Sequence, residues 1–453
     1  MISDTLEVLS LHELDQAHHL HPFTNHADME AMGGTHLIKS GSGCYVYDEN
    51  DRPLLDGLAG LWCVNVGYDC AEIREAIMDQ LERLPFYCSF FNSTTEPAIR
   101  LAAALSEIAP PRLNHAMFCN SGSEAAESAL KTIRAYHKLV GRPEKKKLLS
   151  RSFAYHGVTL GATSLTGLPG CYLPFDLPLE GFIHVPGPHP YAANNGMNPE
   201  EYGAWCIEQT AATIEKEGAH TIAAMFVEPV QGAGGVIVPP LSYLKDLRKL
   251  CRDHEILFVS DEVITGFGRV GDWFASNPTT WDLDPDILNM AKGLTSGYVP
   301  LGATMVSDEI ANVLKSGGYF AHGYTYSGHP VSAAAALANI EVIKKKKLLP
   351  YVKDDIGPYF QKCLQEFSEH RAVTEIRGVG LLGALEVVPR GGRAELTPTT
   401  VLGVKAAGLV RHHGAIVRGI RDLIAISPPL IITHEEVDRL FESVRRGLDE
   451  LWD

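Results

Sequence analysis

A lysine in an apolar segment is the residue of this chain best suited to chemistry. Lys292 follows residues 285–291, which are mostly apolar and predict a buried strand. A buried ammonium group is costly unless a partner offsets its desolvation, so the amine of such a lysine loses its proton readily. A neutral lysine amine is a nucleophile that can form a Schiff base with a carbonyl group. The position of Lys292 therefore predicts either a buried partner or covalent chemistry.

The segments around Lys292 predict an α/β fold. From about residue 100, apolar segments alternate with helical ones, a pattern typical of a mainly parallel sheet with both faces covered. Ligands of such sheets bind beyond the carboxyl ends of the strands. Polar or ionisable residues follow five successive predicted strands, at 120–124, 155–157, 228–231, 261–263 and 292–293. We expect these five strand ends to form one site.

The first of these strand ends is suited to a phosphate. Residues 121–124 read Ser-Gly-Ser-Glu and precede a helix predicted to begin near Ala125. The start of a helix offers free backbone N–H groups and a positive dipole end, and both favour an anion. The alternative is an ordinary helix cap, since serine is a preferred capping residue.

A carboxylate at a second strand end points to the rest of the ligand. Asp261 follows the apolar residues 256–260, so its side chain is expected to be poorly solvated unless a positive group faces it. A protonated ring nitrogen would serve, and the alternative is a structural aspartate bonded to backbone amides or to Arg269. Pyridoxal 5'-phosphate carries a phosphate, a pyridinium nitrogen and a carbonyl that lysine can attack.

Ordered motifs then identify a family that this chain resembles, the class III or omega aminotransferases. Within that class, residues 61–67 and 84–87 resemble omega-amino acid and amine transaminases that use pyruvate. The resemblance runs from about His18 to the C-terminus and implies the type I fold of pyridoxal-phosphate-dependent transferases. The motifs that carry it are NSGSE (120–124), YHG (155–157), EPVQGAGG (228–235), DEVITGFGR (261–269), AKG (291–293) and TYSGHP (325–330).

The resemblance also implies roles for single residues. Lys292 would hold the cofactor covalently and later move a proton, while Asp261 would keep the ring nitrogen protonated. Tyr155 and Val263 would lie against the two ring faces, and Thr325 would reach the phosphate of a neighbouring subunit, which implies a homodimer or a tetramer. The residues expected at the cofactor are Ser121, Gly122, Ser123, Tyr155, Glu228, Asp261, Val263, Lys292 and Thr325.

Substrate residues follow from the same resemblance. Arg418 matches an arginine that binds the acceptor's carboxylate, for which a guanidinium fork is well shaped, although a surface arginine after a strand is the alternative. Arg421 stands where many relatives have glycine and would add a second cation. The side chains expected around the substrate are Trp62, Phe23, Phe90, Tyr155 and Arg418, with Phe86 and Tyr87 nearby.

Two departures from the branch that uses 2-oxoglutarate favour pyruvate as the acceptor. That branch typically has a glutamate at the position of Ala233 and commonly a glutamine at the position of Ile264. We therefore expect an amine or omega-amino acid donor and a keto acid acceptor, pyruvate, that react in turn in a ping-pong cycle. Other pyridoxal-phosphate reactions on this fold stay open, namely a decarboxylating transaminase, an aminomutase and a phospho-lyase.

A nicotinamide-dependent dehydrogenase is a remote alternative. The chain has two Gly-x-Gly-x-x-Gly matches, at 266–271 and 378–383. The first leads into a proline-containing loop and the second into a strand-like segment. Neither has the strand, turn and helix that a dinucleotide fingerprint requires.

Composition limits the partners and the compartment. The formal net charge of −16 disfavours nucleic acid and anionic membrane surfaces, and no apolar run is long enough to predict a membrane span. The nine cysteines lack any Cys-x-x-Cys pair, which favours reduced thiols and a cytoplasmic protein. The nineteen histidines show no helical His-x-x-x-His spacing and no matched Cys/His spacing, so we expect no metal site.

Changes in pattern along the chain predict two domains. Residues 69–330 carry the alternating strands and helices and are expected to form a large cofactor-binding domain. Residues 331–453 begin with a long helix and continue as short strands and a closing helix, which predicts a smaller α+β domain. The N-terminal segment 1–68 has its own short strands and is expected to join that smaller domain.

Overall fold

The computed structural model describes residues 9–31, 33–189, 196–391 and 401–452 of the 453-residue chain. Its centre is a seven-stranded sheet in the order β4-β10-β9-β8-β7-β5-β6. Only β10 among these strands runs antiparallel to its neighbours, so the sheet is mainly parallel. The strands are β4 (Leu113–Cys119), β5 (Lys147–Arg151), β6 (Phe182–Val185), β7 (Ile222–Val227), β8 (Leu257–Asp261), β9 (Ile287–Met290) and β10 (Gly302–Ser307).

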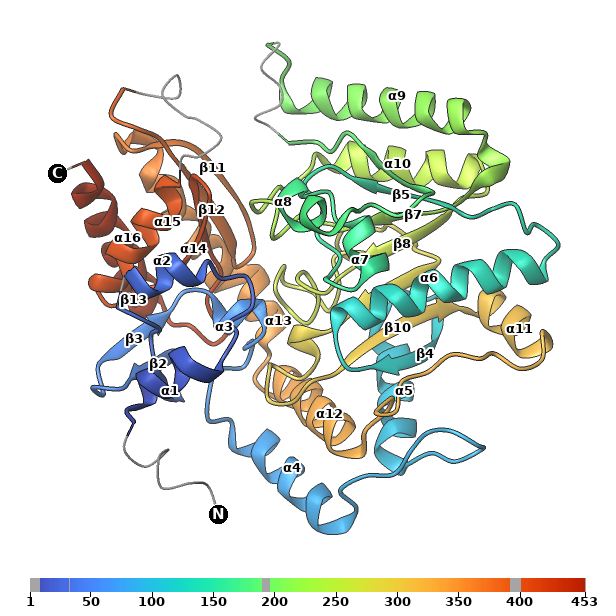
Figure 1. Cartoon of the computed structure of the whole chain (residues 1–453), viewed down its shortest axis with the longest axis horizontal. Coiled ribbons are helices and arrows are strands. Elements are labelled where there is room, and N and C mark those ends of the chain that lie inside the picture. Colours follow the sequence, from blue (N-terminus) through green and yellow to red (C-terminus); the bar gives the residue numbers. More distant parts are fainter. Residues whose placement is uncertain (1–8, 32, 190–195, 392–400, 453) are drawn as a thin grey trace.

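Helices cover both faces of this sheet (Figure 1). Consecutive strand residues face opposite sides, so Met225 packs under the helices of one face and Phe226 under those of the other. Both faces are therefore apolar, which is why these strands appear in the sequence as continuous apolar runs. One face is covered by α9 (Pro199–Glu217) and α10 (Leu241–Asp253), and the other by α6 (Gly122–Leu139) and α11 (Asp308–Ser316).

Two smaller sheets come from the two ends of the chain. The first has the order β1-β2-β3-β13, with β1 (Ile38–Ser42), β2 (Tyr45–Asp48), β3 (Pro53–Asp56) and β13 (Ala415–Ile416). Strand β13 pairs in parallel with β3, so the N-terminal strands join the C-terminal region as predicted. The second has the order β11-β12-β15-β14, with β11 (Val373–Val379), β12 (Leu382–Val387), β15 (Leu423–Ile426) and β14 (Arg418–Ile420).

Helices complete this smaller region and the connection to the large sheet. Around the small sheets lie α1 (Leu11–His18), α2 (His26–Ala31), α14 (Gly357–Gln365), α15 (Leu402–His412) and α16 (His434–Asp449). Between the regions lie α3 (Ala59–Trp62), α4 (Ala71–Arg83), α5 (Glu96–Ile108), α12 (Pro330–Lys345) and α13 (Leu348–Tyr351), and two short helices, α7 (Leu160–Leu165) and α8 (Pro169–Tyr172), follow β5.

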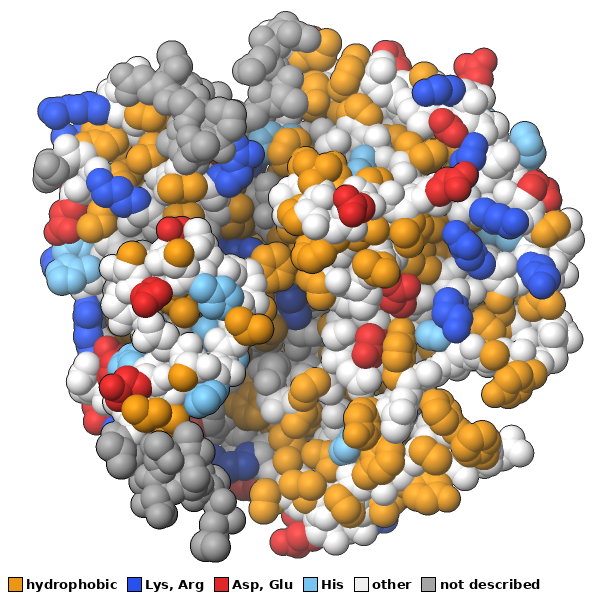
Figure 2. Space-filling view, in the orientation of Figure 1, with side chains coloured by type: hydrophobic (Ala, Val, Ile, Leu, Met, Phe, Trp, Pro, Cys, Tyr) orange, Lys and Arg blue, Asp and Glu red, His pale blue; other side chains and the backbone are white. Residues whose placement is uncertain are grey.

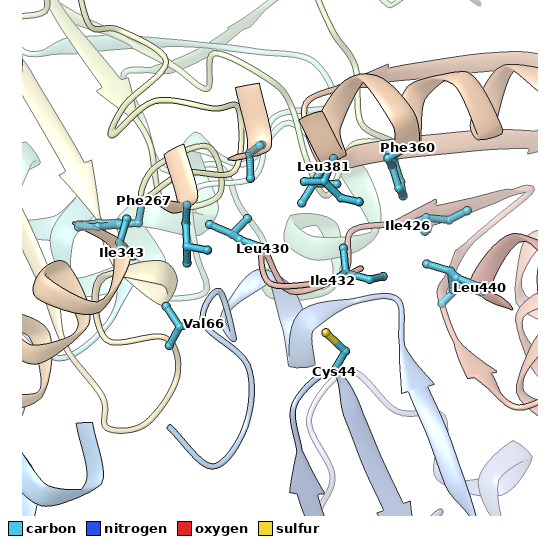
Figure 3. Close-up of a cluster of buried hydrophobic side chains, with 14 of the residues drawn as sticks. Cys44, Val66, Phe267, Ile343, Phe360, Leu381, Ile426, Leu430, Ile432 and Leu440 are labelled. Carbon is cyan, nitrogen blue, oxygen red and sulfur yellow. The ribbon is translucent and has the colours of Figure 1, made fainter. Parts of the chain in front are cut away.

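One hydrophobic core runs through both regions. It includes Met290 from the large sheet and Leu440 from α16. Figure 3 shows part of this core, with Leu430 and Ile432 between Phe267 and Leu440. Helix α12 packs against α4 and α5, although the sequence assigns these helices to different domains. The domain boundaries at 68/69 and 330/331 stay predictions.

Two further expectations concern membranes and dinucleotides. Within the described ranges, no helix combines the length and the apolar composition that crossing a membrane requires.

The glycines of 378–383 lie in the β11–β12 hairpin, and those of 266–271 lie in turns after β8. Neither segment leads from a strand into a helix, which removes the structural basis of the dehydrogenase alternative.

Candidate active site

The five polar strand ends meet at one edge of the large sheet. The carboxyl end of β4 leads into the N-terminus of α6, and this turn packs against the ends of β5 and β8. A Cβ atom added at Gly122 would lie 3.2 Å from both methyl groups of Val263, and one added at Gly157 would lie 2.5 Å from the Ser123 Oγ. The glycines at 122 and 157 thus permit a close approach of backbones that larger residues would prevent.

The start of α6 is capped by a serine and has the features that favour an anion. The Ser121 Oγ accepts a hydrogen bond of 3.2 Å from the Glu124 N–H, so the capping interpretation of Ser121 is correct. The Ser123 Oγ accepts a hydrogen bond of 3.0 Å from the Val158 N–H. The N–H groups of Gly122 and Ser123 belong to the first turn, which has no intrahelical acceptors. An eighteen-residue helix therefore presents free donors and its positive end at this point.

Asp261 ends strand β8 and is held by a histidine. Its Oδ2 lies 2.7 Å from the Nδ1 of His156, and both side chains are almost fully buried. The Val263 N–H donates a longer bond of 3.3 Å to Oδ1. Arg269 instead contacts Asn65 and the carbonyl of Pro428, which removes it as the partner of Asp261.

The buried Glu228 links two of the converging loops. It accepts hydrogen bonds from the N–H groups of Tyr155, at 2.8 Å, and Gly232, at 3.1 Å. Burial raises the pKa of Glu228 to about 7, and the nearby Asp261 charge adds to this effect, while His156 opposes it. Burial also raises the pKa of the Tyr155 hydroxyl.

Lys292 lies two residues after β9 and reaches the centre of these loops. Its backbone has a φ of +42°, a value that is uncommon for residues other than glycine. Burial lowers the pKa of its amine, and the charge of Arg418 lowers it further, against the opposing effects of Cys63, Asp261 and Glu228. Within the described part of the chain, the amine has no hydrogen bond or ion pair that would offset this lowering of its pKa.

Trp62 brings Lys292 together with a residue of the smaller region. The Lys292 Nζ lies 5.1 Å from the centroid of the indole ring, and the Arg418 Cζ lies 4.9 Å from it. Trp62 is buried and has a φ of +58° at the end of α3. The Asp56 carboxylate fixes this irregular turn by accepting bonds from the N–H groups of Leu58 and Gly60.

Three predicted site residues lie outside this group. Phe23 is 76% exposed in the turn between α1 and α2. Phe90 packs near Gly323 and Phe91, and Thr325 is exposed in the neighbouring segment, so neither contacts the Lys292 group within one chain. Their segments meet each other, since the Phe90 ring lies against Gly323.

Two residues at the site received no role from the sequence. His156 is the direct partner of Asp261, and its only signal was its place in the YHG motif. Cys63 lies close enough to affect the Lys292 amine and donates through Sγ to the Leu61 carbonyl. Its place beside Trp62 was the only available signal.

The residues present fit pyridoxal phosphate. The helix start with its close glycines suits a phosphate, and the Asp261–His156 pair suits a ring nitrogen that carries a proton. The His156 Nε2 is buried without a partner, and the Lys292 amine is desolvated and free of hydrogen bonds. A phosphate, a pyridinium and a carbonyl thus each have a matching group on this chain.

Comparison with known proteins agrees with this geometry. The family model described as Aminotransferase class-III matches residues 29–448. A putrescine–pyruvate aminotransferase of Pseudomonas aeruginosa is 41% identical over 96% of this chain and 95% of its own. A probable gamma-aminobutyrate transaminase 2, mitochondrial, of Oryza sativa subsp. indica is 41% identical over 93% and 85%.

Solved structures are similar over nearly the whole chain. An (S)-enantioselective omega-transaminase from Thermomicrobium roseum is 42% identical, covers 98% of both chains and has a TM-score of 0.94. The omega transaminase of Pseudomonas jessenii in complex with PMP is 39% identical, with the same coverage and a TM-score of 0.93. The fold is therefore the type I fold of pyridoxal-phosphate-dependent transferases.

The chain belongs to the class III aminotransferases. It is an enzyme that transfers amino groups, and its cofactor is pyridoxal 5'-phosphate.

Proposed function

We propose that this enzyme moves an amino group from a primary amine or an omega-amino acid to pyruvate. The carrying observation is the contact of Lys292 and Arg418 with the same indole ring, at 5.1 Å and 4.9 Å. The Lys292 amine and the Arg418 guanidinium both lie against the Trp62 indole and are therefore close to each other. This short separation suits a small keto acid, whose carbonyl and carboxylate groups are adjacent. The name of the P. aeruginosa relative includes putrescine and pyruvate, and that of the rice relative includes gamma-aminobutyrate, which supports a linear donor.

In this proposal, one set of residues holds the cofactor and Lys292 transfers the proton. Bound pyridoxal phosphate supplies a carbonyl that amines attack and a ring that withdraws electrons. Gly122 and Ser123 would hold its phosphate, Tyr155 and Val263 its ring faces, and Asp261 its protonated nitrogen. Glu228 would hold the Tyr155 loop in place through its hydrogen bond to the backbone.

Lys292 acts as nucleophile and base in this proposal. Burial lowers the pKa of this amine and so shifts it toward the neutral form, in which its electron pair can accept a proton from the donor carbon and return it later. The buried indole of Trp62 keeps water away from one side of this amine. Arg418 disfavours a second positive charge nearby and thereby supports the neutral amine.

Arg418 would select the acceptor. Burial lowers the pKa of its guanidinium, and a carboxylate would offset that desolvation with two parallel hydrogen bonds. Ala233 and Ile264 support pyruvate over 2-oxoglutarate, because both are buried, and Ile264 packs on Gly232. This cluster offers no polar partner for a second carboxylate.

We further propose a homodimer in the cytoplasm. The segments around Phe91 and Tyr319 expose large apolar side chains, which are 87% and 92% exposed. Figure 2 shows hydrophobic side chains spread over the lower right of this face, where the loop after α4 lies. A second copy covering these segments would bring Phe90 and Thr325 to its own site. Free thiols at all nine cysteines suit a reducing compartment.

The acceptor role is tested with Arg418→Ala. A panel of amines first identifies a donor that bleaches the bound cofactor's visible absorption, which pyruvate should then restore. In Arg418→Ala, kcat/KM for pyruvate should fall about 10- to 100-fold, the loss expected for charge-assisted hydrogen bonds. An uncharged aldehyde acceptor should change less than about threefold.

A second arginine gives the matched control. Arg421 is exposed and has a φ of +50°, so Arg421→Gly fits the backbone while removing a nearby cation. An unchanged ratio of pyruvate to aldehyde turnover in this variant would assign the acceptor's carboxylate to Arg418 alone, whereas a lowered ratio would add Arg421 to the acceptor site. Equal losses with both acceptors in Arg418→Ala would disprove the carboxylate role, and a panel in which no amine changes the cofactor spectrum would disprove transamination.

A further inference from the structure

Three side chains near the N-terminus form a cluster far from the strand ends in the sequence and in the fold. Asp15 lies in α1, and His19 and His21 follow that helix. The His19 Nδ1 lies 3.1 Å from the Asp15 Oδ1, and the His21 Nε2 lies 2.9 Å from the same oxygen. One ligand atom of each residue lies within 4.8 Å of the other two, and among the described residues no other trio of this kind is found.

We propose that Asp15, His19 and His21 bind a transition-metal cation of the zinc class. Imidazole nitrogens and a carboxylate oxygen are typical zinc ligands. Because zinc bonds are about 2.0–2.2 Å long, the ligand atoms of a tetrahedral site lie about 3.3 Å apart. The two measured separations are close to that value, so small movements would admit the ion.

Neighbouring groups hold the three ligands in place. The spacing of Asp15 and His19 puts them one helical turn apart, and the His19 N–H donates a bond of 2.9 Å to the Asp15 carbonyl. The Thr35 hydroxyl donates to the Asp15 Oδ2 at 2.9 Å. The His21 Nε2 lies 3.0 Å from this oxygen and 2.9 Å from Oδ1, so Oδ1 is the oxygen that both imidazoles approach without a third partner. The backbone N–H of His21 donates to the Nε2 of His26 at 3.1 Å. Such outer bonds orient ligands in metal sites.

The surroundings leave a route and a free coordination position. Asp15 and His21 are 18% and 19% exposed, whereas His19 is 60% exposed. A cavity of about 330 Å³ is lined by Asp15, His19, His26 and Glu30 among others. His26 already accepts a hydrogen bond, so water is the expected fourth ligand. Figure 2 shows histidine and acidic side chains close together on the surface over α1 and α2.

This proposal differs from the expectation of no metal site. That expectation depended on His–His and Cys–His spacings, and it did not consider the Asp15–His19 pair. A bound ion would join the end of α1 to Thr35, which precedes β1, and would restrain the N-terminal segment. The alternative is that the carboxylate simply bridges two imidazoles by hydrogen bonds, in which case zinc binds weakly or not at all.

Zinc binding is measured on the full-length holoenzyme after removal of any affinity tag and dialysis against a chelator. Calorimetric titration with zinc chloride and elemental analysis should give one ion per chain. His19→Ala, which changes the most exposed ligand, should weaken binding at least about tenfold. His18→Ala removes an adjacent exposed histidine that is outside the trio and should bind like the wild type.

Hydrogen exchange provides a second readout. Zinc should slow exchange of the amides in residues 11–26 in the wild type and in His18→Ala, but not in His19→Ala. An unchanged bound-cofactor spectrum shows that each variant is folded. The proposal is overturned if His19→Ala binds zinc as tightly as the wild type, or if the wild type binds none at about 100 μM, a level well above that expected for a three-ligand site.

Discussion

At the scale of single residues, burial decides which ionisable groups carry charge. Lys292 favours its neutral form because its amine is desolvated and has no carboxylate in contact. Asp261 is also buried, but its contact with His156 offsets the cost of burying the carboxylate. Glu228 receives only two backbone N–H bonds, and burial raises its pKa to about 7. The same edge of the sheet thus favours different protonation states in neighbouring residues.

The raised pKa of Glu228 predicts a pH dependence of stability. An unfolded glutamate ionises near pH 4.3, whereas folded Glu228 keeps its proton to about pH 7. Between these values the folded state binds more protons, so this residue's contribution to stability falls as pH rises. In Glu228→Gln, that fall should be absent. The Tm of the apoenzyme is measured for both proteins from pH 5 to pH 8.

The quantity to compare is the change with pH of the Tm difference between the two proteins. A constant offset is expected as well, because Glu228→Gln loses an acceptor for the Gly232 N–H at every pH. The wild type should lose a few degrees relative to the variant between pH 5 and pH 8, in line with about 1–3 kcal/mol. A difference that stays constant with pH would show that Glu228 is already ionised at pH 5.

At the scale of elements, the site depends on how closely the end of β5 approaches the start of α6. Gly157 has a φ of +133°, and an added Cβ would lie 2.8 Å from the Cα of Ser123. The backbone there has to move, since the contact is not with a flexible side-chain end. The phosphate site proposed at Gly122 and Ser123 therefore depends on a residue of a different loop.

Gly157→Ala should weaken cofactor binding about tenfold or more, which corresponds to at least about 1.4 kcal/mol. The reason is that the added methyl group displaces the first turn of α6. The Kd for pyridoxal phosphate is measured by titrating the apoenzyme and following fluorescence. Gly408→Ala in α15 is the control, because no atom lies within 4 Å of its added Cβ, and it should bind normally. An unchanged Kd in Gly157→Ala would show that the proposed phosphate site does not depend on Gly157.

Elements with long apolar or amphipathic patterns were predictable from sequence. Helix α6 and strand β8 are within a few residues of the predicted ranges, because α6 follows a helical pattern and β8 is a continuous apolar run. Strand β10 was not predicted, although it completes the sheet between β4 and β9. Its six residues, Gly-Ala-Thr-Met-Val-Ser, mix small, polar and apolar side chains, and their pairing with two other strands leaves no local signal.

At the scale of the whole molecule, the site needs both regions of one chain and, in our proposal, a second chain. Trp62 and Arg418 come from outside the large sheet, and Figure 2 shows this face hollowed between the two lobes. Phe90 and Thr325 lie outside the Lys292 group, so in our proposal they act on the site across a subunit interface. Oligomerisation would then be a condition of activity.

Mixed dimers test this arrangement. Lys292→Ala removes the nucleophile, while Thr325→Asp places a charge that repels phosphate in the partner's site. A mixed dimer keeps one intact site, formed by Lys292 of the second variant and Thr325 of the first. Each variant alone should be nearly inactive, and dissociating and reassociating them together should restore about a quarter of wild-type activity by random pairing. Activity no higher than the average of the two parents would contradict the exchange of Thr325.

The sequence alone determined the class of chemistry, because motifs at successive strand ends must meet at one edge of a parallel sheet. Ser121 to Ser123, Tyr155, Glu228, Asp261 and Lys292 were predicted as site residues in this way. The tertiary structure decided their partners. The contacts of Asp261 with His156, of Lys292 and Arg418 with Trp62, and of Asp15 with two histidines depend on side-chain packing between distant or irregular segments, for which the chain carries no periodic signal.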